Sequence, residues 1–345
     1  MIPIQNIYYM LSYAFQVLNE QGYKNIATEQ FNNTGELMAA ILEKGIAIQI
    51  KRGLGKEYIL QTEALSSLQG KIDIAESIKT QSMLRKQLIC TYDEFSVNSI
   101  MNRIIKSTVE LLLRSNISKQ RKKNLRKLMV YFSEVDFIDL YTVNWNVQYN
   151  RNNQTYRMLI SICYLVVKGL LQTQSNGHTK LMDFLDEQRM CRLYEKFILE
   201  YYRREFKNQI NANASQIPWQ LDNEENSMLP VMQSDIMLQS GEKVLIIDAK
   251  YYEHSTQVQF DKHTLHSGNL YQIFTYVKNK EYELREKDHT VSGMLLYAKT
   301  DEEIYPNNVY QMSGNQITVR TLDLNLPFDE IAGQLNTIAK THFDL

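Results

Sequence analysis

The chain has 345 residues, a formal net charge of -1 and a hydrophobic fraction of 44%. This length is enough for two folded domains, each with its own core. The balanced charge excludes a global basic excess, so any contact with DNA has to come from local clusters. The three cysteines show no CxxC spacing, which argues against a zinc site or an iron–sulfur cluster and fits a reducing compartment.

The N-terminal stretch is apolar but lacks the features of a targeting segment. Gln5 and Asn6 interrupt it, and no basic segment precedes it. It is therefore a poor signal peptide and is too interrupted to span a bilayer. We expect a cytoplasmic protein with no membrane association.

Two helices, a β-hairpin and two short strands are expected in a mixed α/β N-terminal region. Apolar residues at helical spacing predict an amphipathic helix over 4–18 and a second helix over 35–45, with Gly45 as its C-cap. The alternating pattern that follows, up to about residue 60, predicts a projecting β-hairpin. Its tip is the basic, glycine-bearing stretch KRGLGK at 51–56. Short strands are expected at 69–74 and 86–92.

The stretch from 97 to 133 has a helical pattern and a strong basic bias. Asn98 or Ser99 can cap its first helix. The second helix carries seven basic residues and no acidic residue between Arg114 and Lys127. Such a run can contact DNA phosphates, an acidic partner surface or only water. A helix over 155–172 is apolar on nearly all sides and is expected to be buried.

The C-terminal half predicts a sheet with helices around it. In chain order we expect a helix at 187–208, strands at 231–239 and 243–251, a helix at 265–281, a strand at 291–298, two further short strands and a helix at 328–340. This order is typical of an α+β or α/β domain with a central mixed sheet flanked by helices. Because 140–150 is polar, we divide the chain into domains 1–145 and 146–345.

The strongest chemical signal is VLIIDAKYY at 244–252, where a core strand ends in an acid and a lysine. Side chains alternate along a strand, so Asp248 and Lys250 share one face. Asp235 lies upstream, before a Ser240-Gly241 turn signal. If Gln239 pairs with Val244, Asp235 falls opposite Asp248. A two-residue loop instead pairs Asp235 with Ile246, whose side chain lies on the same face as Asp248. A three-residue loop would place the two acids on opposite faces.

Two carboxylates on one face of a hairpin, about 5 Å apart, repel each other unless a cation lies between them. Mg²⁺, or Mn²⁺ in its place, is the natural partner for Asp235 and Asp248, with the Ala249 carbonyl as a third ligand. Lys250 can orient or deprotonate a water and stabilise the charge that develops on a phosphate. The pattern thus predicts phosphodiester hydrolysis. The alternative is a solvated Asp–Lys ion pair, and on the residues alone the two interpretations are about equal.

Two helices can add to this site. Gln272 and Tyr276 lie four residues apart on one helix face and could bind a DNA backbone. Tyr276 in the core and Gln272 in solvent is the alternative. Either Glu195 or Glu200 could supply another carboxylate, although both also fit the surface of an amphipathic helix.

These residues lie in several ordered blocks that resemble the McrC family, the nuclease subunits of McrBC modification-dependent restriction systems. The blocks are IPIQNIYYMLSYAF, LQGKIDIAESI, NRIIKSTVELLL, SDIML with LIIDAKYY, and NLYQIFTY. The resemblance covers nearly the full chain and implies a C-terminal PD-(D/E)xK nuclease fold. It assigns Asp235 and Asp248 as the two acids, Lys250 as the lysine, and Gln272 with Tyr276 as the QxxxY element. The motif here is D-A-K rather than E-x-K.

The same resemblance implies partners. They are a hexameric McrB-like AAA+ GTPase, whose hydrolysis such a subunit stimulates, and double-stranded DNA carrying 5-methylcytosine-type bases. No GxxxxGK[ST] motif is present, so a motor has to come from another chain. The N-terminal region is expected to enter the pore of the ring, with the KRGLGK hairpin as the candidate contact. The alternative function is a non-catalytic activator of the GTPase with a vestigial nuclease site.

Overall fold

The structure is a computed structural model. It describes residues 2–15, 18, 23, 26, 29, 31–150, 153, 155–174, 187–223, 228–252, 257–259, 262–299 and 305–345. The chain forms two compact units, each described here by itself. The sheet unit comprises Met1–Phe31 and Asp183–Leu345, and the helical unit comprises Asn32–Met182.

This division corrects the expected domains 1–145 and 146–345. The apolar helix after the polar segment, α6 (Tyr156–Gln174), packs against α2 and α4 and so belongs to the helical unit. The N-terminal helix α1 packs instead against α7 of the sheet unit. In both cases the apolar face of a helix packs against helices that are distant in the sequence. A local change in polarity does not reveal such partners.

The sheet unit has the expected order of helices and strands. Its strands and helices are α1 (Ile4–Ala14), α7 (Glu187–Glu205), β4 (Asn211–Asn213), β5 (Gln216–Ile217), β6 (Met232–Gln233), β7 (Ile236–Ser240), β8 (Lys243–Lys250), β9 (Gln257–Gln259), β10 (Lys262–Thr264), α8 (Ser267–Glu283), β11 (Thr290–Ala298), β12 (Asn308–Met312), β13 (Asn315–Leu322) and α9 (Phe328–Phe343). The strand expected at 231–239 is divided, because β6 pairs with β5 and only β7 joins the main sheet.

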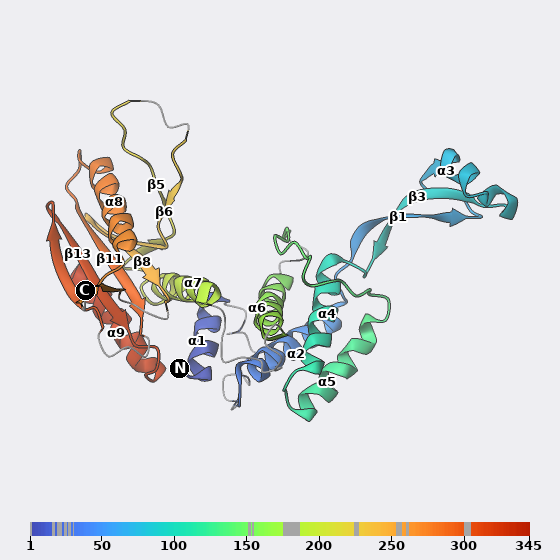
Figure 1. Cartoon of the computed structure of the whole chain (residues 1–345), viewed down its shortest axis with the longest axis horizontal. Coiled ribbons are helices and arrows are strands. Elements are labelled where there is room, and N and C mark those ends of the chain that lie inside the picture. Colours follow the sequence, from blue (N-terminus) through green and yellow to red (C-terminus); the bar gives the residue numbers. More distant parts are fainter. Residues whose placement is uncertain are drawn as a thin grey trace. The chain divides into compact units, whose positions relative to one another are not determined.

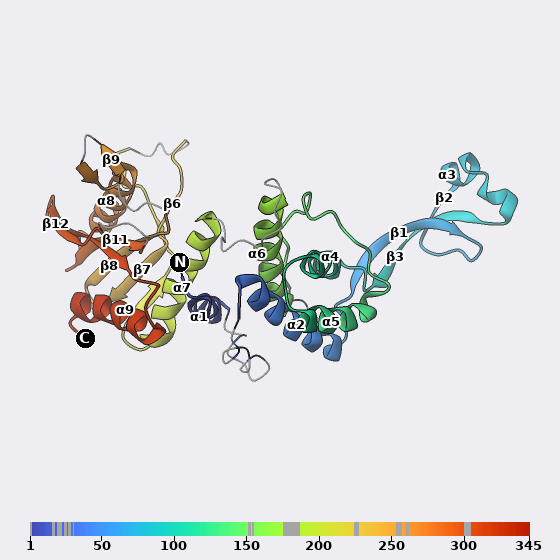
Figure 2. The same cartoon turned by 60° about the horizontal axis from the view of Figure 1, so that its bottom comes forward.

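The main sheet has six strands in the order β12-β13-β11-β8-β7-β4. β8, β11 and β13 are parallel and the other neighbours are antiparallel, so the predicted mixed sheet is confirmed. Helix α8 covers one face, and α7 with α9 covers the other (Figures 1 and 2). The Tyr202 hydroxyl joins these two helices by donating to the Leu335 carbonyl at 3.0 Å.

Close packing holds α8 on the sheet. A Cβ at Gly293 of β11 would lie 2.8 Å from Ile273 and 2.9 Å from Val277 of α8. Both side chains are fully buried with Ile246 of β8 in the core beneath the helix. Glycine at this position therefore lets α8 approach the strands that carry the candidate site.

The helical unit consists of helices and a narrow sheet. Its elements are α2 (Thr34–Arg52), β1 (Glu57–Leu65), β2 (Lys71–Asp73), α3 (Ile74–Lys79), a 3-10 turn (Ser82–Arg85), β3 (Leu88–Ser96), α4 (Ile100–Arg114), α5 (Lys119–Met129), a 3-10 turn (Val130–Phe132) and α6. Ser99 caps α4, because its side chain accepts the backbone N–H of Asn102. Of the two residues that could cap this helix, the serine does so.

The hairpin expected after residue 45 is wrong. Helix α2 continues through Gly45 and ends at Gly53, which adopts φ +86 as the C-cap. Ile46 and Gln49 are buried on the same stripe as Leu42. The short alternating pattern therefore also fits the period of a helix, and the longer apolar stripe decides between the two.

An arm of three antiparallel strands takes the place of that hairpin. β1 pairs with β3 and β3 with β2, and Figure 1 shows α3 near the far end of these strands. KRGLGK lies at the base of the arm rather than at its tip. Asn102 of α4 holds both roots of the arm by donating to the carbonyls of Gly55 at 2.9 Å and Val97 at 2.8 Å.

Candidate active site

The two predicted acids face each other across an antiparallel strand pair. β7 and β8 pair with Gln239 opposite Val244 and Ile236 opposite Ile247, which is the first of the registers that the sequence left open. Asp235 directly precedes β7 and Asp248 follows Ile247, so extending this register by one step sets Asp235 opposite Asp248. The turn itself is tighter than four residues, because Ser240 also pairs with Lys243. Gly241 allows this turn with its φ of +57.

Each polar side chain of the cluster has a specific contact. Asp235 Oδ2 accepts the backbone N–H of Ala249 at 3.0 Å, which ties the start of β7 to the end of β8. Lys250 Nζ donates to Asp248 Oδ1 at 2.9 Å. Asp248 is only 1% exposed, and its Oδ2 has no hydrogen-bond partner in the described part of the chain. The site thus holds a buried acceptor that the protein leaves unsatisfied.

Burial determines the charge state of this cluster. It raises the pKa of the Asp248 carboxyl to about 7, the Lys250 ammonium opposes this rise, and the Asp235 carboxylate adds to it. Burial lowers the pKa of Lys250, but the adjacent Asp248 carboxylate outweighs it and the net pKa is raised. Lys250 therefore stays protonated, while Asp248 is an acid whose ionised form needs more positive charge than one lysine supplies.

The donor set fits a divalent cation with oxygen ligands. The buried Oδ2 of Asp248 is an acceptor without a donor, and Asp235 lies opposite it in the register. Within the described ranges no group of three His, Cys, Asp or Glu side chains is placed to hold a metal. An ion here would be held by the two carboxylates and the Ala249 carbonyl, a set that suits a hard ion that keeps several waters.

Glu195, not Glu200, lies beside this cluster. The negative charge of Asp235 helps burial to raise the pKa of Glu195. Cys191 Sγ, one turn earlier on α7, donates to Glu195 Oε1 at 3.1 Å. Glu200 instead accepts from Arg203 at 2.7 Å. The structure therefore distinguishes the two glutamates that the sequence left equivalent.

Gln272 and Tyr276 lie on α8, which packs against the face of β8 that carries Asp248. Gln272 Nε2 donates to the Tyr276 hydroxyl at 2.9 Å. Tyr276 is 8% exposed and packs with Ile246 in the core, as the alternative interpretation expected. The described residues show no direct hydrogen bond from this pair to the two aspartates.

Three further residues lie near the site, and the sequence did not single them out. Cys191 Sγ lies 3.9 Å from the Ala249 carbonyl and can donate to it. Tyr297 of β11 is in register with Lys250, and its hydroxyl accepts from Asn269 at 2.9 Å. The i to i+4 spacing of Cys191 and Glu195 was a usable signal. No local signal predicts the pairing of Tyr297 with Lys250, because these residues belong to β11 and β8, and α8 lies between these two strands in the sequence.

Together these features define a mixed-sheet α+β protein with a buried acid–lysine cluster at the end of a strand pair. Residues 5–298 match the family described as McrBC 5-methylcytosine restriction system component. The chain is also 30% identical, over 329 residues, to the type IV methyl-directed restriction enzyme EcoKMcrBC of Escherichia coli K12, covering 94% of this chain and 93% of the relative. The chain belongs to the McrBC 5-methylcytosine restriction system component family.

Two solved structures match this chain. One is a half-complex of Thermococcus gammatolerans McrB AAA+ hexamers with bound McrC, with a TM-score of 0.48, 18% identity, and coverage of 97% of this chain and 76% of that chain. The other is the cryo-EM structure of the Thermococcus gammatolerans McrBC complex, with a TM-score of 0.43, 22% identity, and coverage of 59% of each chain. None of the described helices combines the length and apolar character needed to cross a membrane.

Proposed function

We propose that this chain is the Mg²⁺-dependent endonuclease subunit of an McrBC-type restriction complex, with a PD-(D/E)xK site that hydrolyses phosphodiesters in DNA carrying 5-methylcytosine-type bases. The observation that carries the proposal is the buried, unsatisfied Oδ2 of Asp248 in register with Asp235. Burying a carboxylate oxygen without a donor is costly. A bound cation removes that cost for the ionised carboxylate, whereas the protein's own way to remove it is a proton held between Asp248 and Asp235, which together with burial raises the pKa of Asp248.

In this proposal each residue has a defined task. Asp235, Asp248 and the Ala249 carbonyl hold the ion, which when bound supplies Lewis-acid activation of the phosphate and of a water. Lys250 is held by Asp248 Oδ1 and is protonated, so it stabilises negative charge on the phosphate and orients the water. This favours the orienting role over the role of a base, both of which the sequence allowed. Glu195 is the further acid beside Asp235.

The proposed protein partner is a hexameric McrB-like AAA+ GTPase, whose hydrolysis this subunit stimulates. The matching family is described as a component of the McrBC system, and the relative from Escherichia coli is EcoKMcrBC. Both descriptions support the proposal that this chain works with another subunit. The chain itself has no P-loop motif, so nucleotide hydrolysis requires another subunit. We assign the contact to the arm rather than to KRGLGK, because the arm exposes large apolar side chains that soluble proteins otherwise cover. These are Tyr58, Leu60, Ile74, Ile78, Leu84 and Phe95.

The test is Asp248→Ala in the complete complex with GTP, Mg²⁺ and methylated DNA. Because the variant loses one of the two side-chain metal ligands, cleavage should fall by about 1000-fold or more, while GTP hydrolysis stays stimulated. Asp288→Ala, at an exposed aspartate of the same unit, is the matched control and should cleave normally.

Two other outcomes identify other functions. Stimulated GTP hydrolysis without DNA cleavage by the wild-type complex, in either Mg²⁺ or Mn²⁺, would indicate an activator with a vestigial site. Cleavage by the purified wild-type chain alone would indicate a nuclease that works without its partner. Normal cleavage by Asp248→Ala would refute the site.

A further inference from the structure

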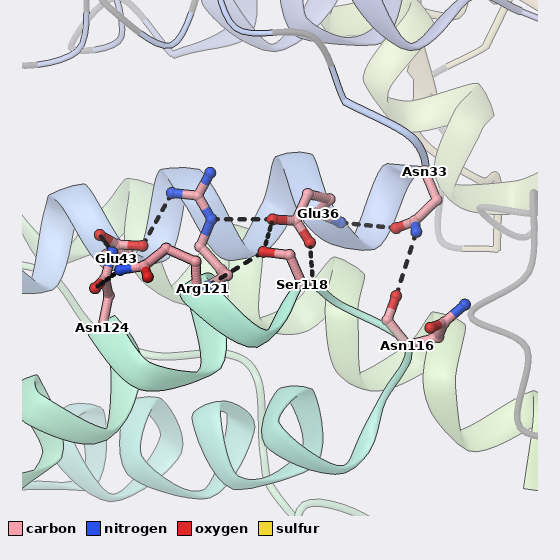
Figure 3. Close-up of polar contacts among 8 residues, drawn as sticks. Asn33, Glu36, Glu43, Asn116, Ser118, Arg121 and Asn124 are labelled. Carbon is pink, nitrogen blue, oxygen red and sulfur yellow. Dashed lines mark hydrogen bonds and ion pairs between the residues drawn. The ribbon is translucent and has the colours of Figure 1, made fainter.

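Helix α5 of the helical unit has two faces with opposite electrostatic roles. One basic residue, Arg121, turns inward toward α2, where Figure 3 shows it between Glu36 and Glu43. Arg121 Nε donates to Glu36 Oε1 at 3.3 Å and Nη1 donates to Glu43 Oε2 at 2.9 Å. These three side chains are only 13–22% exposed. The inner face is therefore a largely buried ion-pair network.

This network fixes the rotation of the helix. The Ser118 hydroxyl and backbone N–H both donate to Glu36 at 2.8 Å, and the same hydroxyl caps α5 by accepting the Arg121 N–H (Figure 3). One turn further on, Asn124 Nδ2 donates to Glu43 at 3.0 Å. Polar contacts to both carboxylates thus anchor one side of α5 along its first two turns. The opposite side is consequently held outward.

The outward side carries an unpaired row of cations, which we call the α5 basic face. The residues are Lys119, Lys122, Lys123, Arg126 and Lys127. All except the half-buried Lys122 are exposed, and α5 contains no acidic residue. In the described part of the chain none of the five side chains forms an ion pair or hydrogen bond, whereas nearby Arg114 pairs with Glu110 at 3.0 Å. Glu36 and Glu43 of α2 make their contacts with the inner side of α5.

We propose that the α5 basic face binds the phosphate backbone of double-stranded DNA without reading sequence, at a place separate from the acid–lysine cluster. This proposal rests on the proposed function, which makes DNA the substrate. From Lys119 to Lys127 the helix runs about 12 Å. A duplex presents roughly seven phosphate charges over that length. Four lysines to one arginine also favour nucleic acid over an acidic protein, because lysine is depleted at protein interfaces.

The test measures equilibrium binding of the full-length chain to an unmodified 30-base-pair duplex in EDTA, which separates binding from metal-dependent cleavage. The variant is K119Q/K123Q/K127Q, which removes three charges from one exposed line and keeps the helix propensity. Each lost phosphate contact lowers the salt dependence, so the slope of log K against log salt should fall by about 2.7. Affinity at 50 mM salt should fall by about tenfold or more.

The matched control is K207Q/K287Q/K340Q, three exposed lysines of the sheet unit, which changes the net charge equally. Its binding and salt slope should stay near wild type. An unchanged slope in the α5 variant, or an equal loss in the control, overturns the proposal. Normal DNA binding with loss of the AAA+ partner would assign the α5 basic face to an acidic protein surface and also overturn it. Failure of Asp248→Ala to stop cleavage would refute the nuclease site without affecting this result.

Discussion

Two largely buried clusters of opposite charges lie in the part of the chain that the structure describes, and they differ in completeness. In the helical unit Arg121 meets two carboxylates, and Ser118 and Asn124 supply further donors to the same two carboxylates. In the sheet unit Lys250 donates to Asp248 Oδ1 and Asp235 accepts a backbone N–H, yet Asp248 Oδ2 is left without a donor among the described residues. The first cluster is satisfied by protein groups alone. The second also has one cation beside two carboxylates, but it leaves one buried carboxylate oxygen without a donor, and this deficit distinguishes a binding site from a structural network.

The comparison predicts that the satisfied cluster contributes more to stability. Arg121→Ala leaves Glu36 and Glu43 unpaired in a poorly hydrated place, which costs 3–5 kcal/mol when such a pair is fully buried. Because these side chains are 13–22% exposed, we expect the free energy of unfolding to fall by about 2–3 kcal/mol. Urea unfolding of the full-length chain measures it.

A matched control separates this contact from helix effects. Lys127→Ala, on the outer side of the same helix, should change the free energy of unfolding by less than about 0.5 kcal/mol. A cost below 1 kcal/mol for Arg121→Ala would mean that the network is no more stabilising than a surface ion pair.

The incomplete cluster should show the opposite behaviour in metal-free buffer. The folded-state pKa of Asp248 is about 7 and the unfolded value is about 3.9, so between these values the folded protein binds more protons. The contribution of Asp248 to stability is therefore present at low pH and is lost as pH rises toward 7. The difference in free energy of unfolding between Asp248→Asn and wild type should therefore be about 2 kcal/mol larger, in favour of Asp248→Asn, at pH 8 than at pH 5.

The measurement is urea unfolding of both proteins in EDTA at the two pH values. Saturating Mg²⁺ should remove most of this difference at pH 8 by stabilising the wild type, because a bound cation compensates the ionised carboxylate. Parallel pH profiles for wild type and Asp248→Asn would show that the carboxylate is already compensated by Lys250.

The sequence predicts a contact between two residues well when they are close together along the chain, and poorly when they belong to distant elements. Alternation along β7 and β8 predicts that either even-length loop sets Asp235 and Asp248 on one face, but the sequence did not select the register that the structure shows. The prediction of a hairpin at 46–60 was wrong because the five residues 46–50 fit both the period of a strand and the period of a helix. The apolar stripe that decides for the helix starts earlier in the sequence, at Met38. The basic run could be seen, but its division into inner and outer faces needs Glu36 and Glu43 of another helix. Local patterns predict elements, whereas partners across elements require the fold.

The smallest expected effect tests whether the α8 pair belongs to the incomplete cluster. Tyr276→Phe removes the hydroxyl that accepts from Gln272 and keeps the ring in the core. Stability should fall by only about 1 kcal/mol, since the half-buried Gln272 can turn to water. If the pair positions a DNA backbone, kcat/KM for cleavage falls by about tenfold. Tyr282→Phe, on the exposed end of the same helix, should leave both quantities unchanged. Cleavage within twofold of wild type in Tyr276→Phe would restrict this tyrosine to packing.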